Sequence, residues 1–473
     1  MADIHQYKCK NCMGKVQFDS ETQMMKCPYC ESIFDLSVYM KEEQELKNKA
    51  IEEGHKEDVT EINNPEKVEI LSGVADIKPM PTTDDATKDG KKKKAPHKVL
   101  NYNKNLFKTS GRKWEKDDLS HLVVYHCDTC GGEQVSSADT GATRCPYCDH
   151  QMVVSNAFEG ELRPEMIIPF QVNQETAAEN YKKYIEKRKF LPKEFKNENH
   201  IRDIQGVYVP YWVFSADLEA QIQETDTTQR FYTKGNYNYT ETTYYDVRRE
   251  GNASYKDVPA DASTKMDDFM MESIEPFNLA DAKDFSNVYL AGYMASRYDV
   301  TPSECMDHVM YRVVESTYSK LNHTIKGYTG KVSSHKEFDF LSGSVKYALF
   351  PVWLLNTTYR GENYTFAMNG QTGKFTGNLP KDKTKMILVA LAISAGSALL
   401  LTLLLLLLGL NVLAPIIGIA GGCAIGFGIV WGIAGKLNGI KEKKEANDYI
   451  TDFQLTYKHD RKIRTQTTKT KRD

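Results

Sequence analysis

The sequence has little net charge and lacks the motifs that mark several common enzyme classes. Over 473 residues the formal net charge is −3, which is too small to define a partner. Gly370-Gln-Thr-Gly373-Lys374 is not a Walker A motif, because its spacing differs and no Ser or Thr follows the lysine. The 11 histidines are scattered, and neither His-Glu-x-x-His nor Gly-x-Ser-x-Gly occurs. These absences argue against a nucleotide hydrolase, a zinc protease and a serine hydrolase, and we expect no enzyme activity.

Cysteine is scarce outside a unit that occurs twice. Each copy reads C-x2-C-x14-C-P-Y-C, and the second copy begins 118 residues after the first. A Cys-x-x-Cys turn places two sulfurs on one edge of a tetrahedron, and a second such turn completes a closed four-thiolate site that suits zinc. The sequence therefore predicts two structural zinc ions, one bound by Cys9, Cys12, Cys27 and Cys30, the other by Cys127, Cys130, Cys145 and Cys148.

Two other interpretations of these cysteines fit their context less well. Cys-Pro-Tyr-Cys alone resembles the redox motif of glutaredoxins, but each copy follows a partner Cys-x-x-Cys and lacks a surrounding βαβ pattern. A disulfide framework needs an oxidising compartment, and residues 1–6 do not resemble a secretory signal. We therefore expect cytosolic thiolates held by metal. Cys305 and Cys423, outside the repeats, are expected to be small buried hydrophobic residues.

Charge is absent from two long segments near the C-terminus. Residues 386–408 and 412–435 contain no charged side chain, and each exceeds the roughly 20 residues that a helix needs to cross a bilayer. The short turn between them, around Asn411, is also uncharged, whereas lysines flank the outer ends of both segments. Positive residues stay on the cytoplasmic side, so both termini are expected there. The sequence predicts a two-helix transmembrane hairpin over 386–435 in the cell membrane.

Small residues distinguish the second span from the leucine-rich first one. Gly418, Gly422 and Gly426 recur every fourth residue, a spacing that lets helix backbones approach closely. This face is expected either to pack against the first span or to join copies of the chain in an oligomer. Residues 436–473 carry a net charge of +5, so we expect a basic cytoplasmic tail attracted to anionic lipid.

The remaining sequence predicts a linker between the cysteine repeats and an α+β domain after them. Residues 37–120 begin as a charged, helix-prone segment and then become rich in Pro, Thr, Asp and Lys, which is typical of a disordered linker. The run Lys91–Lys94 would allow contact with nucleic acid or lipid, although a solvated spacer is the simpler interpretation. Capping boxes at Thr176–Glu179 and Thr301–Glu304 predict two helix starts within residues 156–380.

Strand signals in this domain include an internal repeat. Tyr208-Val-Pro-Tyr-Trp-Val-Phe214 resembles Leu349-Phe-Pro-Val-Trp-Leu-Leu355 at an offset of 141, which indicates an internal duplication. Proline within such a run favours an edge strand or a strand start. Between the blocks, tyrosines alternate with basic residues over 230–249. This stretch could stack nucleic-acid bases, but a plain β-hairpin is the simpler interpretation.

These patterns together predict a multi-domain chain. Two small four-cysteine zinc ribbons, an α+β domain with antiparallel hairpins and a two-helix transmembrane hairpin are expected. The expected boundaries are 1–36 for ribbon 1, 37–120 for the linker, 121–155 for ribbon 2, 156–380 for the α+β domain, 386–435 for the hairpin and 436–473 for the tail.

The ribbons resemble the zinc ribbon of transcription factor IIB. Together with the Pro-x-Trp blocks, the Asn369–Lys374 segment and the two spans, they resemble a family of bacterial, mostly Firmicute, two-span membrane proteins with TFIIB-type zinc ribbons. Members are sometimes labelled PriA-like helicases, but this chain lacks nucleotide-binding motifs. The resemblance implies a membrane platform that recruits cytosolic partners beside phage-shock-type membrane-stress proteins. The doubled ribbon and the long linker depart from the simplest layout of that family.

The leading functional hypothesis is therefore a non-enzymatic adaptor that recruits protein partners to the cytoplasmic face of the membrane. The alternative is a membrane-tethered regulator that binds nucleic acid through its ribbons and basic segments. Salt-dependent binding to DNA or RNA would separate the two, because contacts with phosphates release counterions.

Overall fold

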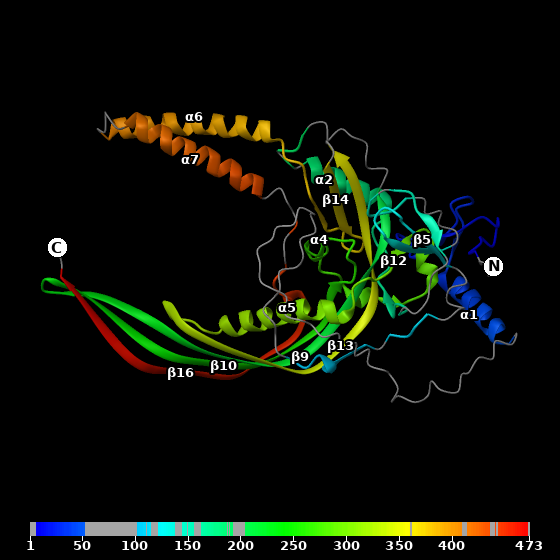
Figure 1. Ribbon diagram of the computed structural model, residues 1–473, viewed down its shortest axis with the longest axis horizontal. Coiled ribbons are helices and arrows are strands. Elements are labelled where there is room, and N and C mark those ends of the chain that lie inside the picture. Colours follow the sequence, from blue (N-terminus) through cyan, green and yellow to red (C-terminus); the bar gives the residue numbers. More distant parts are fainter. Residues whose placement is uncertain are drawn as a thin grey trace.

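The computed structural model describes residues 6–52, 102–109, 111–114, 122–137, 144–148, 150–155, 162–186, 188, 190–192, 204–359, 362–408, 414–435, 440 and 443–471. The expected disordered linker falls mostly outside these ranges, as does the turn at Asn411. In the described part, a 13-stranded mixed sheet forms the centre, and a 3-stranded sheet belongs to the N-terminal segment. Figure 1 shows a body from which a curved arm of strands and a pair of helices project.

Four long antiparallel strands run from the body into the arm. They lie in the order β13, β9, β10, β16, and Figure 1 shows them as a curved band. β9 and β10 form a hairpin that turns at Gly235, where the φ of 58° favours glycine. The tyrosine-rich stretch is therefore part of a β-hairpin. The strands are β9 (Gln205–Lys234), β10 (Tyr237–Asp261), β13 (Gly330–Tyr359) and β16 (Ile450–Lys471).

Burial along β9 follows its sequence pattern. Residues 207–214, a continuous apolar run, are buried on both faces of the sheet. From 216 to 226 every second residue is buried, as expected where one face is covered and the other is not. Residues 229–234, at the tip, are exposed. Helix α5 (Pro302–Asn322) covers part of the half-buried stretch through an apolar cluster of Ala220, Ile222 and Leu321.

The two expected helix starts have different outcomes. α5 begins with the expected capping box of Thr301 and Glu304, followed by Pro302 in its first turn. The expectation for α2 is wrong, because this helix spans Gln174–Glu186 and starts before Thr176. The Asn173 side chain instead accepts a hydrogen bond from the Thr176 N–H at 2.7 Å, which is the geometry of an N-cap.

The two Pro-x-Trp blocks lie opposite each other in the centre of the sheet. In the antiparallel register of β9 and β13, Pro210 faces Leu349 and Pro351 faces Tyr208. The expected edge or start position is therefore wrong for both prolines. The Pro210 carbonyl accepts from the Ala262 N–H, one residue beyond the end of β10. The N–H and C=O of one residue point to the same side of a strand. The N–H that Pro210 lacks would therefore point to the side on which β10 has just ended.

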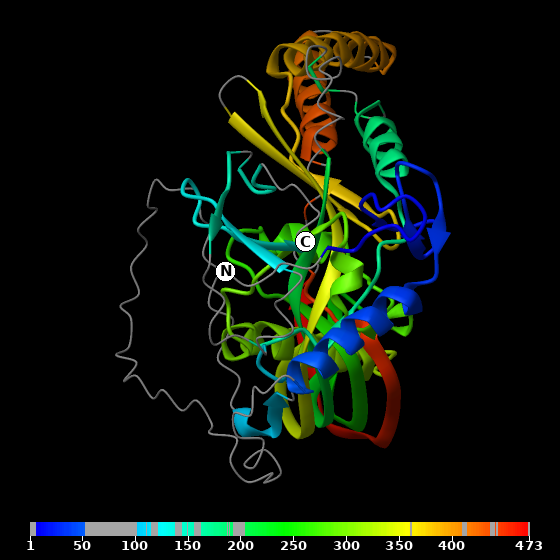
Figure 2. The ribbon, with the colours of Figure 1, turned by 90° about the vertical axis from the view of Figure 1, so that its right-hand side faces the viewer.

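The two cysteine-rich ribbons are joined to the body rather than folded apart from it. In ribbon 1 (residues 6–34), the Phe18 N–H donates to the Ala291 carbonyl at 2.9 Å, and its ring packs on Tyr289. Ribbon 2 (residues 122–155) is part of the 13-stranded sheet, because β6 (Glu133–Ser137) pairs with β12 (Met294–Ser296) and β12 pairs with β9. Figure 2 shows ribbon 1 in blue and ribbon 2 in cyan on either side of the body.

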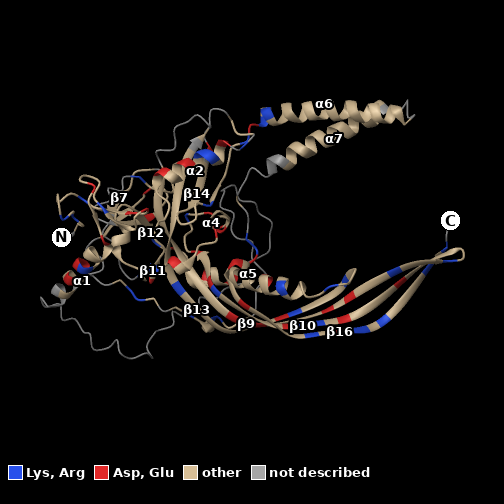
Figure 3. Cartoon of the chain, turned by 180° about the vertical axis from the view of Figure 1, so that it is seen from behind, with Lys and Arg blue, Asp and Glu red and all other residues tan. Residues whose placement is uncertain are grey.

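Helices α6 (Lys383–Leu407) and α7 (Ala414–Gly435) are long and apolar enough to cross a membrane. Only 11% and 22% of their most apolar windows are buried within the chain, so they are not a covered core pair. Figure 3 shows both helices almost free of charged residues, apart from the first turn of α6. The segment expected to be a basic tail returns to the body, where β16 pairs with β10. The C-terminal part is thus a sheet strand rather than a separate tail.

Short elements complete the described chain. They are β1 (Gln17–Asp19), β2 (Met24–Lys26), β3 (Ile33–Phe34), α1 (Leu36–Glu52), η1 (Lys104–Leu106), β4 (Phe107–Thr109), β5 (Leu122–His126), β6 (Glu133–Ser137), β7 (Val153–Ser155), β8 (Met166–Ile167), α4 (Asp268–Ser273), η4 (Leu279–Asp281), β11 (Lys283–Asp284), η5 (Asn287–Leu290), β12 (Met294–Ser296), β14 (Glu362–Asn369), β15 (Phe375–Gly377) and η6 (Asn447–Tyr449).

Candidate metal centres and a buried charge network

Ribbon 1 brings its four cysteines close enough to share one metal ion. All four sulfurs lie within 4.8 Å of one another. Cys9 Sγ is 3.5 Å from Cys30 Sγ, and Cys12 Sγ is 3.5 Å from Cys27 Sγ. Four thiolates at such distances form a closed tetrahedral set, the arrangement of structural zinc sites with metal–sulfur bonds of about 2.3 Å.

Ribbon 2 repeats this geometry with the second predicted set. Cys127 Sγ is 3.5 Å from Cys148 Sγ, Cys130 Sγ is 3.6 Å from Cys145 Sγ, and all four sulfurs again lie within 4.8 Å. His126, next to this set in sequence, lies near carboxylates instead, with Nδ1 3.6 Å from Glu133. The fold therefore gathers all eight predicted ligands into two groups that could each hold a metal ion.

Each copy has a glycine two residues after its second cysteine, and the turn together with a neighbouring tyrosine explains why. In ribbon 1 the Cys9 N–H donates to the Gly14 carbonyl at 2.7 Å and closes the turn. A Cβ at Gly14 would lie 2.7 Å from the Tyr29 ring, and one at Gly132 would lie 3.1 Å from the Tyr147 ring. Each tyrosine of the Cys-Pro-Tyr-Cys segment thus rests on a glycine, where a Cβ would collide at Gly14 and would be tightly packed at Gly132.

Hydrogen bonds around ribbon 1 favour the thiolate form of Cys30, whereas contacts with neighbouring sulfurs raise the pKa of the Cys12 thiol. The Asn11 N–H donates to Cys9 Sγ at 3.4 Å. Hydrogen bonds with the side chain and backbone of Ser32 lower the pKa of the Cys30 thiol to about 6. Because the thiolate is the metal ligand, such outer contacts support binding.

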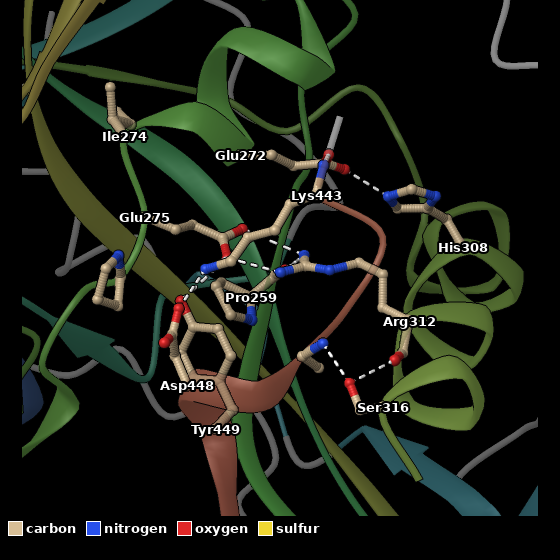
Figure 4. A network of polar contacts seen from close by, with 12 residues as sticks. Pro259, Glu272, Ile274, Glu275, His308, Arg312, Ser316, Lys443, Asp448 and Tyr449 are labelled. Carbon is tan, nitrogen blue, oxygen red and sulfur yellow. Dashed lines mark hydrogen bonds and ion pairs between the residues drawn. The ribbon is translucent and has the colours of Figure 1, made fainter. Parts of the chain in front are cut away.

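A second cluster consists of charged side chains buried between α4 and α5. The His308 ring is hydrogen-bonded to the Glu272 carboxylate, and Arg312 donates to both oxygens of Glu275, at 3.1 and 2.6 Å. Burial raises the pKa of Glu272, but the hydrogen bond and charge of His308 outweigh it, so that pKa lies below its usual value. Figure 4 shows these pairs facing each other, with His308 and Arg312 on α5, Glu272 on α4 and Glu275 just after α4.

The segment after α7 completes this network. The Lys443 N–H donates to Glu272 Oε2 at 2.9 Å, and its Nζ lies 3.3 Å from Glu275 Oε2. Tyr449 Oη donates to the same Glu275 oxygen at 3.1 Å, and Lys443 also pairs with Asp448. Glu275 is therefore shared by α5 and by the chain that returns from the apolar helices, as Figure 4 shows.

The turn at Asn369–Lys374 holds this network from the other side. Asn369 Nδ2 donates to the Ile274 and Pro276 carbonyls at 3.0 and 3.2 Å. Lys374 Nζ donates to the Glu275 carbonyl. The Asn369–Lys374 segment, which is not a phosphate-binding loop by its spacing, thus fixes the backbone on both sides of Glu275.

Sequence reasoning missed this network, although one signal was present. His308 and Arg312 lie four residues apart within the apolar stripe of α5, where a charged side chain must find a buried partner. The two remaining cysteines also differ from each other. Cys305 is buried as expected, with Sγ 3.4 Å from the Asp261 carbonyl, whereas Cys423 is exposed on α7 and that expectation is wrong.

Comparison with known proteins gives one informative relative. A Bacillus subtilis (strain 168) protein described as "Uncharacterized protein YdjG" is 33% identical over 329 residues. The match covers 59% of this chain and 96% of that protein. No family model matches the chain, and no solved structure matches it. Because the similarity extends over nearly the whole relative, the chain belongs to the same family as Bacillus subtilis YdjG.

Proposed function

We propose that this protein is a membrane-anchored zinc-ribbon adaptor that recruits protein partners to the cytoplasmic face of the membrane. The observation that carries the proposal is the shared network at Glu275. This residue joins the body, through Arg312, to the segment that returns from the apolar helices, through Lys443. An anchor held in this way keeps the soluble surfaces at a defined place beside the bilayer.

The anchor is attached to the body at both of its ends. Before α6, the Asp382 N–H donates to the Phe190 carbonyl at 2.9 Å. After α7, the Ala446 N–H donates to Ser316 Oγ at 2.6 Å, and β16 then pairs along β10. The lysines that flank both helices favour a cytoplasmic body, because positive residues stay on that side.

Zinc is the metal that best suits the two centres. All eight candidate ligands are thiolates in closed sets, which is typical of structural zinc and leaves no open coordination position for a substrate. In this role zinc contributes folding free energy and holds the ribbons in shape for protein contacts. Recruitment during membrane stress is the setting that we propose, in line with the resemblance to two-span platform proteins.

The test starts with affinity purification of the full chain from gently solubilised membranes, with an unrelated two-span protein as the control. Proteins enriched over the control are identified by mass spectrometry and expressed separately. Each is then mixed with vesicles that contain the purified full chain, and its co-flotation is measured. We expect at least one soluble protein to float only with chain-bearing vesicles. If none of the enriched proteins does so, the adaptor proposal is wrong.

A second candidate function is nucleic-acid binding by the arm. Its outermost part carries a group of basic side chains together with tyrosines, and Lys469 Nζ lies 3.6 Å from the centre of the Tyr237 ring. Tyr232 and Tyr239 stack on each other with ring centres 5.2 Å apart. To test this function, the binding of a labelled single-stranded oligonucleotide to the full chain is measured at several salt concentrations. The affinity should fall steeply between about 50 and 200 mM salt. The basic residues on β16 are Lys458, Arg461, Lys462, Arg464, Lys469 and Lys471.

A further inference from the structure

The two ribbons differ in the exposure of the metal-binding end, which is the end formed by the Cys-Pro-Tyr-Cys segment. In ribbon 2 the Cys145-Pro146 pair is buried, and Tyr147 and Cys148 are half-buried against the body. In ribbon 1 the corresponding Pro28, Tyr29 and Cys30 are exposed, and Tyr29 reaches 72% exposure. Two copies of one unit therefore differ in whether a protein surface covers this end.

The covered copy shows what kind of surface receives it. Tyr147 Oη is hydrogen-bonded to Ser296 Oγ, which in turn donates to Gln134 Oε1 at 3.0 Å. Beside the tyrosine, Asn356 Nδ2 donates to the Pro146 carbonyl. The receiving surface thus offers a hydroxyl to the tyrosine and an amide donor to the backbone.

A cation completes this surface. Lys265 Nζ donates to the Cys130 carbonyl at 3.0 Å. Four thiolates around one divalent zinc carry a net charge of about −2, so a lysine at this position matches the electrostatics of the loaded centre. Charge complementarity therefore adds to the hydrogen bonds.

The exposed copy carries a second distinguishing feature, Met13. This residue has a φ of 63°, in the left-handed region that favours glycine, and the corresponding residue of ribbon 2 is Gly131 with a φ of 67°. Met13 is 66% exposed and is the neighbour of Gly14, on which the Tyr29 ring rests. The left-handed conformation is shared by Gln23 and Glu31 of the same ribbon. What sets Met13 apart is its exposed apolar side chain beside the metal-binding turn. Its flexible, polarizable side chain suits a protein contact.

We propose that the exposed end of ribbon 1, formed by Cys12, Met13, Pro28, Tyr29 and Cys30 and here called the knuckle face, binds a separate protein. Its binding surface resembles the one that receives ribbon 2. It offers a hydroxyl or amide side chain to Tyr29 and a lysine or arginine beside the metal centre. The inference rests on the proposed adaptor function and names the surface by which one partner is recruited.

The test uses the full chain in its native membranes, with the photoreactive amino acid p-benzoylphenylalanine in place of Tyr29. The control carries the same group at Phe231, an arm residue that is 71% exposed and so matches Tyr29 in accessibility. We expect one discrete cross-linked protein from position 29 and none from position 231. The cross-linked peptide should contain a lysine or arginine and a hydroxyl or amide residue.

The identified partner is then titrated against purified full chain, wild type and two variants. Tyr29→Ala and Met13→Gly should each weaken binding by about tenfold or more, as expected for anchors of an interface. Met13→Gly should keep two zinc ions and an unchanged or higher melting temperature, since glycine accepts the left-handed conformation. The affinity of Met13→Gly for the partner therefore tests the proposal even if Tyr29→Ala disturbs the ribbon.

Several results would overturn the proposal. The first is a cross-link at position 29 that is no stronger than the one at position 231. The second is a cross-link from position 29 to lipid, to nucleic acid, to a second copy of the chain or to residues 53–101 of the same chain. The third is an unchanged affinity of Met13→Gly for the partner. The adaptor function would survive these results if other partners still floated with chain-bearing vesicles. The two failures are therefore distinguishable.

Discussion

Arg312 and Glu275 form a two-point ion pair in which both side chains are only 1% exposed. Such a pair gains little net stability relative to apolar residues, but removing one partner leaves an uncompensated buried charge. Here the carboxylate also receives Lys443 and Tyr449 from the segment after α7. The pair therefore holds the attachment of the apolar helices α6 and α7 as well as the body.

Replacing Arg312 with methionine should lower the free energy of unfolding of the full chain by about 3–5 kcal/mol. Lys443→Met should cost less, because the lysine is 24% exposed and water screens its charge. Chemical unfolding in detergent measures both. The double variant Arg312→Met/Glu275→Leu should recover part of the loss. If it is as unstable as the single variant, the stranded carboxylate is not the cause.

The C-terminal strand should detach in acid. The hydrogen bond from Arg249 lowers the pKa of Asp460 below its usual value, and burial only partly opposes this. A carboxyl with a lowered folded-state pKa contributes its full stability above its ordinary pKa of about 3.9 and loses it as pH falls through the folded value. The protection factors of β16 amides, which correct for the intrinsic pH dependence of hydrogen exchange, should therefore fall below about pH 4. In the Asp460→Asn variant the β16 amides should already be less protected at neutral pH, and acid should cause no further loss of protection through this residue.

The two metal centres should differ in what their loss does to the body. Cys27→Ser and Cys145→Ser should each reduce zinc from two ions to one per chain, as measured by elemental analysis. Cys145→Ser should lower the melting temperature of the body more, because the strands of ribbon 2 pair within the large sheet whereas ribbon 1 packs on its surface. Equal losses in both variants would contradict this difference. Fewer than one zinc ion in the wild type would contradict the metal assignment itself.

The glycines of α7 allow a matched test of helix packing. A Cβ at Gly422 would lie 2.6 Å from the Ala398 backbone nitrogen, whereas one at Gly428 would meet nothing within 4 Å. Gly422→Leu should push α6 and α7 apart and lower thermal stability in detergent, while Gly428→Leu should not. Both variants should still insert into the membrane. The structure places Gly418, Gly422 and Gly426 against α6 of the same chain, and association of copies through this face stays a prediction.

Membrane topology is open to a direct measurement. Reporter fusions at Met1 and Asp473 should both respond as cytoplasmic, and an insertion at Asn411 should respond from the opposite side. This follows from the lysines outside both helices and the uncharged turn between them. A C-terminus on the far side would also conflict with the pairing of β16 and β10, because β10 is a strand that runs out of the body.

Local chemistry was enough to predict the two four-cysteine groups that could hold a metal ion, and the apolar helices. The C-x2-C-x14-C-P-Y-C spacing identifies eight cysteines without any long-range information, since each half-site is one tight turn. Likewise, an uncharged run of more than about 20 residues identifies a helix that could span a membrane, because length and composition are local properties. The capping box at Thr301 is equally local, and it marks the start of α5.

Long-range contacts settled the rest, and no local pattern could have supplied them. The partner of β16 is β10, which lies far earlier in the chain, so the basic segment was indistinguishable from a solvated tail. Pro210 and Pro351 are tolerated in central strands only because neighbouring strands end beside them. The carboxylates that pair with His308 and Arg312 come from α4 and from the residues just after it. Tyr29 and Tyr147 have the same neighbours in sequence, and only the position of the body decides which of them is covered, because burial depends on surfaces that folding brings together.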